Sequence, residues 1–170
     1  LQLALLAPAP EIEDAKRDLK EMEETLDEYL AFAKGLSEEA PECVDLGALA
    51  LAARAEAARA GADIEVTCEG DVGLPGRARG LKRCLANLID NAVAHADKVR
   101  VSVRGEASAI VVDIDDDGPG LPEELYEEAF RPFSRLDVTR SRNQKGVGLG
   151  LAIARDVARG HGGDIMLSPS

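Results

Sequence analysis

Long apolar runs, paired metal ligands and paired cysteines are missing from this sequence. Its apolar runs are only a few residues long, too short for a transmembrane helix or the apolar core of a secretory signal. The two histidines, His95 and His161, are far apart in the sequence, which disfavours a histidine-based zinc site. Three cysteines, at 43, 68 and 84, lack the spacing of metal ligands. Their odd number indicates reduced thiols and a cytoplasmic location.

Positive charge is also scarce. There are 20 Lys and Arg residues against 32 Asp and Glu residues, which gives a net charge of −12. This balance disfavours non-specific binding to nucleic acid, so we predict no nucleic-acid partner, although a local pocket can still hold a nucleotide. With 170 residues, 45% of them hydrophobic and 31% charged, the chain is long and apolar enough for one compact domain plus a helical appendage.

The N-terminal segment differs from the rest of the chain. After Pro8 and Pro10, apolar residues recur at alternating intervals of three and four from Ile12 to Leu36. This heptad spacing predicts a long helix over 11–36 in a helical bundle or coiled coil that pairs two chains; an amphipathic helix packed on its own domain is the alternative. Because the chain begins without Met and stops soon after a predicted strand begins, we expect a fragment, with a domain boundary at about residue 40.

Beyond residue 40, helical and strand patterns alternate. Asp45 is the expected N-cap of the first helix, and Gly61 is expected to end it. The predicted body is α+β, with helices on one face of a largely antiparallel sheet. We expect helices over 45–60, 77–96, 123–128 and 148–159, strands over 63–69, 99–103 and 110–114, a further strand from Asp164, and a glycine-rich turn over 70–76.

Asn87, Asn91 and His95 recur every four residues in the helix expected over 77–96. Four residues advance about 400° around a helix, so the three side chains form one slowly drifting polar stripe. Asparagine is a poor helix former, and two on one face of a half-buried helix suggest a site. An amide oxygen can ligate Mg²⁺ and an amide NH₂ can donate to phosphate. A solvated polar face is the alternative.

An acidic, glycine-rich turn follows the strand expected over 110–114. Gly118 and Gly120 permit a tight turn and the close approach of a ligand. An ionised carboxylate only accepts hydrogen bonds, so Asp116 suits an exocyclic amino group such as that of adenine. An ordinary turn rich in Asp and Gly is the alternative.

Gly146, Gly148 and Gly150 stand just before and within the start of the last predicted helix. Free N–H groups at a helix N-terminus bind anions, and glycines let a phosphate reach them. Lys145 precedes the glycines and no strand is predicted before them, which disfavours a Walker motif and a dinucleotide fingerprint. The basic loop over 134–145 is either a linker or a lid over phosphates. Phe130 and Phe133, just before it, are expected to pack at the lid hinge.

Taken in order, these motifs resemble the N, first-glycine, F and second-glycine boxes of sensor histidine kinases. Their ATP-binding domain is shared with type II topoisomerases, mismatch-repair ATPases and heat-shock chaperones. The resemblance runs from about residue 44 to the end and implies a two-layer α/β sandwich, the Bergerat ATPase fold, over 41–170, with its C-terminal strand truncated. Residues 1–40 resemble part of the family's dimerisation and phosphotransfer hairpin: its second helix, without the first helix and its histidine.

The resemblance also implies roles for individual residues. Asn91 would ligate Mg²⁺, Asn87 would contact phosphate or the metal's surroundings, and Asp116 would receive the adenine amino group. The other residues expected to contact ATP are His95, Gly118, Gly120, Leu121, Phe133, Arg140, Lys145, Gly146, Val147, Gly148, Leu149 and Gly150.

Two features depart from the family pattern. The phospho-accepting histidine belongs to the missing first helix, and neither His95 nor His161, which is interpreted as a helix terminus, takes its place. We therefore predict no catalytic residue in this chain, which should bind ATP without autophosphorylating. The family also often has Lys or Arg three residues after the metal-binding asparagine, where this chain has Ala94; Lys98 or an arginine of the lid would then supply the charge.

The predicted activity is transfer of the γ-phosphoryl group of Mg·ATP to a histidine and then to an aspartate of a response regulator, by positioning and charge neutralisation. The expected partners are ATP or ADP, the response regulator and a second copy of the chain. By resemblance, the intact protein sits in the inner membrane through parts missing here, with this part in the cytoplasm. One alternative is a nucleotide-binding scaffold without transfer activity. Another is a hydrolytic ATPase, which would need Glu where Asn87 stands, since Asp90 points about 100° away from Asn91.

Overall fold

The computed structural model describes residues 39–59, 61–134 and 148–169; the predicted heptad helix and nearly all of the predicted basic loop lie outside them. The predicted helices and strands of the body are present apart from the differences given below. In chain order the elements are β1 (Glu42–Asp45), α2 (Leu46–Arg59), β2 (Asp63–Glu69), β3 (Gly73–Gly76), α3 (Ala78–His95), β4 (Lys98–Gly105), β5 (Ile110–Asp116), the 3-10 helix η1 (Glu123–Leu125), α4 (Tyr126–Ala129) and α5 (Gly150–Gly160).

The main sheet has three strands in the order β2-β4-β5. The β4–β5 hairpin is antiparallel, whereas β2 and β4 are parallel because α3 carries the chain back between them. The sheet is therefore mixed, and the expectation of a largely antiparallel one was wrong. A second, two-stranded sheet pairs β1 with β3. Neither of these strands was predicted from the sequence: β3 lies within the predicted turn, and β1 directly follows the predicted domain boundary. Strands of four residues are too short to show an alternating pattern.

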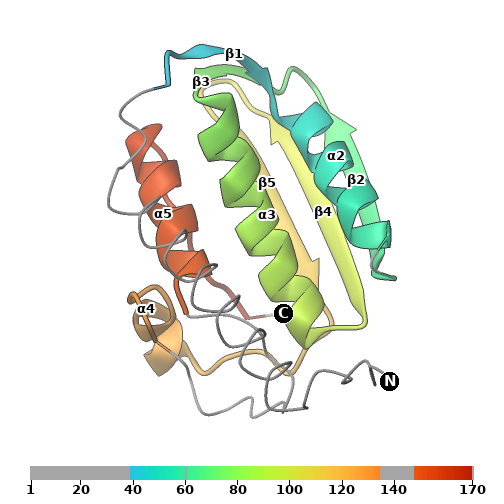
Figure 1. The fold of residues 1–170 in the computed structure, drawn as a ribbon, viewed down its shortest axis with the longest axis vertical. Coiled ribbons are helices and arrows are strands. Elements are labelled where there is room, and N and C mark those ends of the chain that lie inside the picture. The colour runs from blue at the N-terminus through green and yellow to red at the C-terminus, as the bar shows by residue number, and fades with distance from the viewer. Residues whose placement is uncertain (1–38, 60, 135–147, 170) are drawn as a thin grey trace, which may run out of the picture. The chain divides into compact units, whose positions relative to one another are not determined.

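The domain has two layers. Helices α2 and α3 cover one face of the main sheet, and α5 packs beside α3 in the same layer (Figure 1). Val99, Val101 and Val103 of β4 are buried on that face. The residues between these valines, Arg100 and Ser102, are polar and lie on the opposite face, where Arg100 pairs with Glu65 at 3.3 Å. Strand alternation thus makes one face of the sheet apolar and the other polar, which explains why helices cover only one side.

Helix α3 is the central helix, and its N-terminus is capped by distant residues. The N–H of Arg77 donates to Nε2 of His161 at 3.0 Å, and the N–H of Arg79 donates to the Glu39 carboxylate at 3.1 Å. These contacts satisfy N–H groups that a helix leaves free at its start. His161 is itself the C-cap of α5, as predicted. Burial raises the pKa of the Cys84 thiol, between α3 and α5, to about 11, so this cysteine is protonated and unreactive.

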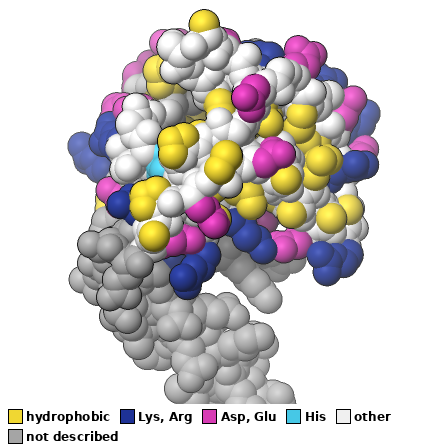
Figure 2. Space-filling model, turned by 90° about the horizontal axis from the view of Figure 1, so that it is seen from above, with side chains coloured by type: hydrophobic (Ala, Val, Ile, Leu, Met, Phe, Trp, Pro, Cys, Tyr) yellow, Lys and Arg dark blue, Asp and Glu magenta, His cyan; other side chains and the backbone are white. Residues whose placement is uncertain are grey.

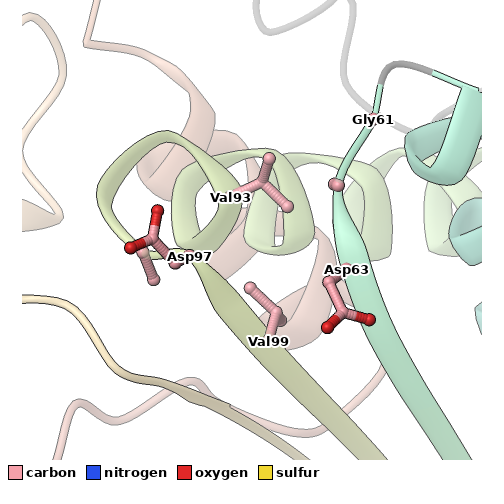
Figure 3. A pocket seen from close by; sticks show the side chains of 7 residues that line it. Gly61, Asp63, Val93, Asp97 and Val99 are labelled. Carbon is pink, nitrogen blue, oxygen red and sulfur yellow. The ribbon is translucent and has the colours of Figure 1, made fainter.

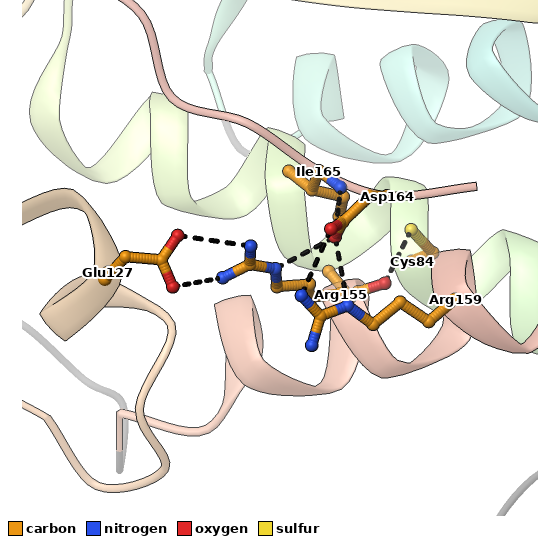
Figure 4. Close-up of polar contacts among 7 residues, drawn as sticks. Cys84, Glu127, Arg155, Arg159, Asp164 and Ile165 are labelled. Atoms are coloured by element: carbon orange, nitrogen blue, oxygen red, sulfur yellow. Dashed lines mark hydrogen bonds and ion pairs between the residues drawn. The ribbon is translucent and has the colours of Figure 1, made fainter.

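Asp164 ties the segment after α5 to that helix (Figure 4). Its carboxylate accepts hydrogen bonds from Arg155 at 2.9 Å and from Arg159 at 3.1 Å. Arg155 also forms a bidentate ion pair with Glu127 of α4 and lies 4.4 Å from the centre of the Phe130 ring. The strand predicted from Asp164 was wrong: no strand forms over 164–169, because the carboxylate holds this segment against α5.

Asp164→Asn should make the stability of the domain less dependent on pH in acid. Hydrogen bonds from Arg155 and then Arg159 hold the pKa of Asp164 well below its usual range. A carboxyl group with a lowered folded-state pKa contributes stability that is present above its unfolded pKa, about 3.9, and is lost as the pH falls toward the folded value.

Urea unfolding measured between about pH 5 and pH 2 checks this, since that is the range in which such a carboxylate protonates. The wild type should lose more free energy of unfolding than Asp164→Asn. Asp156→Asn, which removes an exposed carboxylate from α5 itself, is the control and should follow the wild type. Equal losses in wild type and Asp164→Asn would contradict the assignment.

The surface at the β1–β3 end mixes charge types. In Figure 2, basic, acidic and hydrophobic side chains are interspersed over the described part of this face.

Among the described residues, no helix has the length and apolar character needed to cross a bilayer.

Candidate nucleotide-binding site

The predicted motifs lie against α3. A Cβ atom added at Gly118 would lie 2.8 Å from the carbonyl oxygen of His95, which places the acidic turn at the C-terminal end of α3. A Cβ atom at Gly150 would lie 3.8 Å from Cγ of Asn87, which places the start of α5 beside the amide. The helix that carries the amides therefore connects the acidic turn to the glycine-rich start of α5.

Strand alternation separates the three consecutive aspartates at the end of β5. Asp116 is opposite Val99, which is buried beneath the helices, so Asp116 is on the helix-covered side of the sheet. Asp115 is opposite Arg100, on the polar side. The Asp117 carboxylate accepts hydrogen bonds from the N–H groups of the α3–β4 connection. Asp116 is the aspartate of the three with a carboxylate directed toward the predicted site.

The turn after Asp116 requires glycine. The N–H of Gly118 donates to Oδ1 of Asp116 at 2.9 Å, and a Cβ atom at Gly118 would lie only 2.7 Å from that oxygen. Gly120 has a φ of +68°, which glycine adopts at little cost. Leu121, the next residue, is half-buried. This turn leaves the second carboxylate oxygen of Asp116 able to accept a hydrogen bond from a ligand.

Asn87 carries an unsatisfied buried amide. Its Nδ2 atom is buried and has no hydrogen-bond partner among the described residues. Such a donor costs about 1–3 kcal/mol when it is left unpaired, so its presence calls for a partner. The nearest glycine of α5 leaves the space beside the amide free of a side chain. Asn91, one turn further along, is exposed, and His95 is half-buried.

The segment that ends at Ser134 meets the segment that begins at Gly148. The N–H of Phe133 donates to the carbonyl of Gly148 at 2.9 Å, and Gly148 has a φ of +76°. The sequence predicted that the last helix begins at residue 148. It begins at Gly150 instead, because Gly148 has a left-handed backbone conformation. Phe130 is buried, as expected for hinge packing, but Phe133 is 55% exposed, so it is available to a ligand rather than to the core.

One predicted site residue is buried, and four others lie outside the described part of the chain. Leu149 is fully buried, so any contact with a nucleotide would come from its backbone. Arg140, Lys145, Gly146 and Val147 lie outside the described residues.

Two further sequence interpretations concern charged residues. Lys98 shares the polar face of β4 with Arg100, so it does not replace the cation that the family often has where Ala94 stands. The pKa of Asp90 is raised by burial and then by the Glu56 carboxylate of α2. Asp90 therefore lies toward α2, whereas Asn87 lies toward α5, and Asp90 is not placed to activate a water molecule at the amides.

A separate pocket of about 210 Å³ lies between the C-terminal ends of α2 and α3 (Figure 3). It is lined by Gly61, Ala62, Asp63, Val93, Ala96, Asp97 and Val99. It contains none of the predicted site residues and is not part of the nucleotide site.

The donor set at α3 suits a metal ion only together with phosphate. In the described part of the chain, no three His, Cys, Asp or Glu side chains gather into a metal-binding cluster. The available ligand is the exposed amide oxygen of Asn91. Mg²⁺ is commonly held by one or two protein oxygens together with substrate phosphates and water, so this sparse set fits Mg²⁺ bound along with a nucleotide.

Comparison with known proteins identifies the family. Residues 76–170 match the family model described as histidine kinase-, DNA gyrase B-, and HSP90-like ATPase. The chain therefore belongs to this family. Among curated relatives it is 40% identical over 152 residues to the sensor histidine kinase GtrS of Pseudomonas aeruginosa, covering 89% of this chain and 31% of that protein. It is also 40% identical over 119 residues to the sensor protein CutS of Streptomyces coelicolor, covering 68% and 28%.

A solved structure shows the same fold. The ATP-binding domain of PrrB from Mycobacterium tuberculosis superposes with a TM-score of 0.64 and 29% identity, covering 78% of this chain and 89% of that one. These matches confirm the predicted class, the ATP-binding catalytic domain of sensor histidine kinases, and its α+β Bergerat fold. ATP is the nucleotide that the family implies. The chain spans about a third of the length of the curated relatives named here.

Proposed function

We propose that this chain binds Mg·ATP and forms the catalytic part of a sensor histidine kinase. That kinase would pass the γ-phosphoryl group to a histidine outside these residues and then to an aspartate of a response regulator. The observation that carries the proposal is the buried, unpaired Asn87 amide beside the glycine start of α5. An amide donor and the free N–H groups of a helix start are both suited to phosphate.

The two ends of the nucleotide are assigned to opposite ends of the site. Asp116 accepts the adenine amino group, and Gly118, Gly120 and Leu121 lie along the base. Asn87, Gly148 and Gly150 face the phosphates, together with the backbone of Leu149. His95 and Phe133 lie beside the nucleotide. Arg140, Lys145, Gly146 and Val147 are proposed to contact the phosphates on the strength of the motif alone.

Asn91 is proposed to hold Mg²⁺ through its amide oxygen. When bound, the ion neutralises phosphate charge, as in other phosphoryl-transfer sites. The residues of this chain then bind and orient the nucleotide. Among the described residues of α3 no general base is offered to a water molecule, because Asp90 faces α2 and amides replace acids along the stripe. This arrangement favours transfer to a separate acceptor over rapid hydrolysis, the alternative that would require an acid at position 87.

The remaining assignments concern the intact protein. We propose that residues 1–40 belong to a dimerisation and phosphotransfer hairpin, that two copies pair through it, and that residues 41–170 form the catalytic domain. The heptad pattern and the names of the relatives support this organisation. A cytoplasmic position for this domain and membrane attachment through other parts of the protein belong to the same proposal.

Asn91→Ala should remove the Mg²⁺ dependence of ATP binding. Loss of a hydrogen-bonding group to a charged partner costs about 1.5–3 kcal/mol, which corresponds to a roughly 10- to 150-fold weaker affinity in the presence of Mg²⁺. Titration calorimetry with ATP, in Mg²⁺ and in a chelator, measures both affinities for the wild type and the variant.

The matched control is Asp90→Ala, which changes the preceding residue on the side of α3 toward α2. It should keep the wild-type affinity and the wild-type rate of ATP hydrolysis. Brisk hydrolysis abolished by Asp90→Ala would favour the hydrolytic ATPase instead. A wild-type chain that shows no binding of Mg·ATP would overturn the proposed function itself.

A further inference from the structure

Asp117 joins the acidic turn to the connection between α3 and β4. Its Oδ1 atom accepts hydrogen bonds from the N–H groups of Asp97 and Lys98, both at 2.9 Å. In the opposite direction, the N–H of Asp117 donates to the carbonyl of Lys98 at 3.3 Å. Three hydrogen bonds from one residue therefore fix the start of the turn to the residues that follow α3.

This attachment acts at the point where the turn comes closest to α3. Gly118, the next residue, has its backbone so near the His95 carbonyl that a Cβ atom would lie 2.8 Å from that oxygen. The same glycine donates its N–H to Asp116. The hydrogen bonds of Asp117 thus hold both the turn and the neighbouring carboxylate at a fixed place relative to the end of α3.

The Asp117 carboxylate is kept ionised by its contacts. The Lys98 N–H has the largest effect and lowers the pKa of this group. Burial opposes it, and the N–H groups of Asp97 and of Asp117 itself lower the pKa further. A charged acceptor forms stronger hydrogen bonds with backbone N–H groups than a neutral acceptor does. Oδ1 of this carboxylate is consequently committed to the backbone of the α3–β4 connection.

We propose that Asp117 is a positioning residue that gives the site its preference for adenine by holding the Asp116 turn against the end of α3. This inference rests on the proposed function. Adenine presents an amino group where guanine presents a carbonyl oxygen. A carboxylate accepts a hydrogen bond from the first and repels the second, so a fixed Asp116 distinguishes the two bases, and a mobile one distinguishes them less.

Titration calorimetry of the 170-residue chain with Mg·ATP and Mg·GTP tests the inference. Asp117→Ala removes both accepted hydrogen bonds and should weaken ATP binding about tenfold, as expected for lost hydrogen bonds to a charged group. It should also reduce the ratio of ATP to GTP affinity by a similar factor. Asp117→Asn keeps an oxygen that can accept both N–H groups and should restore most of the affinity and of the ratio.

The matched control is Asp115→Ala, which removes the adjacent carboxylate on the polar face of the sheet and should leave both quantities at wild-type values. Thermal unfolding of each variant identifies those that remain folded. Should Asp117→Ala fail to fold, Asp117→Ser, with a hydroxyl too short to reach both N–H groups, takes its place. An unchanged ratio in a folded variant overturns the inference, as does an equal loss in the Ala and Asn variants.

The proposed function has a separate outcome. If Asp116→Asn weakens ATP binding while Asp117→Ala does not, the adenine assignment stands and only the positioning role of Asp117 is lost. If the wild-type chain binds neither nucleotide, the proposed function and the inference are both overturned.

Discussion

Asp116→Asn should weaken ATP binding roughly 10- to 150-fold, the effect of losing a hydrogen bond to a charged group worth about 1.5–3 kcal/mol. The carboxylate only accepts hydrogen bonds and is on the helix-covered side of the sheet. Asparagine has nearly the same shape, and its amide oxygen can still accept the N–H of Gly118. The turn should therefore persist while the charged acceptor for the adenine amino group is lost. Titration calorimetry with Mg·ATP measures the affinity.

The control for this substitution is Asp115→Asn, one residue earlier in the same strand. That carboxylate is on the polar face of the sheet, so the change in net charge is identical but the position is not. ATP affinity should stay at the wild-type value. If Asp116→Asn also binds ATP as tightly as the wild type, the adenine assignment is wrong. If both variants lose affinity equally, the effect comes from overall charge.

The proposed site consists of local motifs that can be recognised in the sequence, whereas the sheet depends on pairing between distant segments. In the run Asp115 to Asp117, the sequence motif pointed to Asp116, and strand alternation in the structure puts Asp116 on the helix-covered side of the sheet. The structure adds what that spacing does not contain, namely that Asp117 binds the N–H groups of residues about twenty positions away. Such contacts depend on how β5 ends beside α3. Sequence patterns do not show them, because those patterns concern residues that are neighbours along the chain.

The wrong predictions of secondary structure and burial share one physical origin, which is contact between segments far apart in the sequence. The segment Gly73–Gly76 pairs with β1 as a strand, although its glycines and proline are typical of a turn. The segment after Gly163 has three consecutive apolar residues, yet Asp164 binds two arginines of α5 and no strand forms over 164–169. Leu149 lies within a glycine motif and is buried in the core. In each case a tertiary contact outweighs a local preference.

Gly150→Ala should raise the stability of the domain and weaken ATP binding, so it distinguishes an effect on folding from an effect on the site. Gly150 is the first residue of α5 and does not have a positive φ. A Cβ atom there would make ordinary contact with Asn87 at 3.8 Å. Alanine loses less backbone entropy in a helix, so the free energy of unfolding should rise by up to about 1 kcal/mol. The methyl group would also fill the space beside the Asn87 amide, where phosphate is proposed to bind. ATP affinity should fall about 5- to 150-fold, the effect of crowding worth about 1–3 kcal/mol.

Gly148→Ala is the informative comparison, because it should lower stability instead. Gly148 has a φ of +76°, and a Cβ atom would lie 2.7 Å from the carbonyl oxygen of Ser134. The strain should reduce the free energy of unfolding by about 1–3 kcal/mol. Urea unfolding and calorimetry on both variants give the two quantities independently. A Gly150→Ala chain that is more stable yet binds ATP like the wild type would place the phosphates away from Asn87. A Gly150→Ala chain that is more stable and binds ATP weakly would place the phosphates beside Asn87, because unfolding cannot explain a loss of affinity in a stabilised protein.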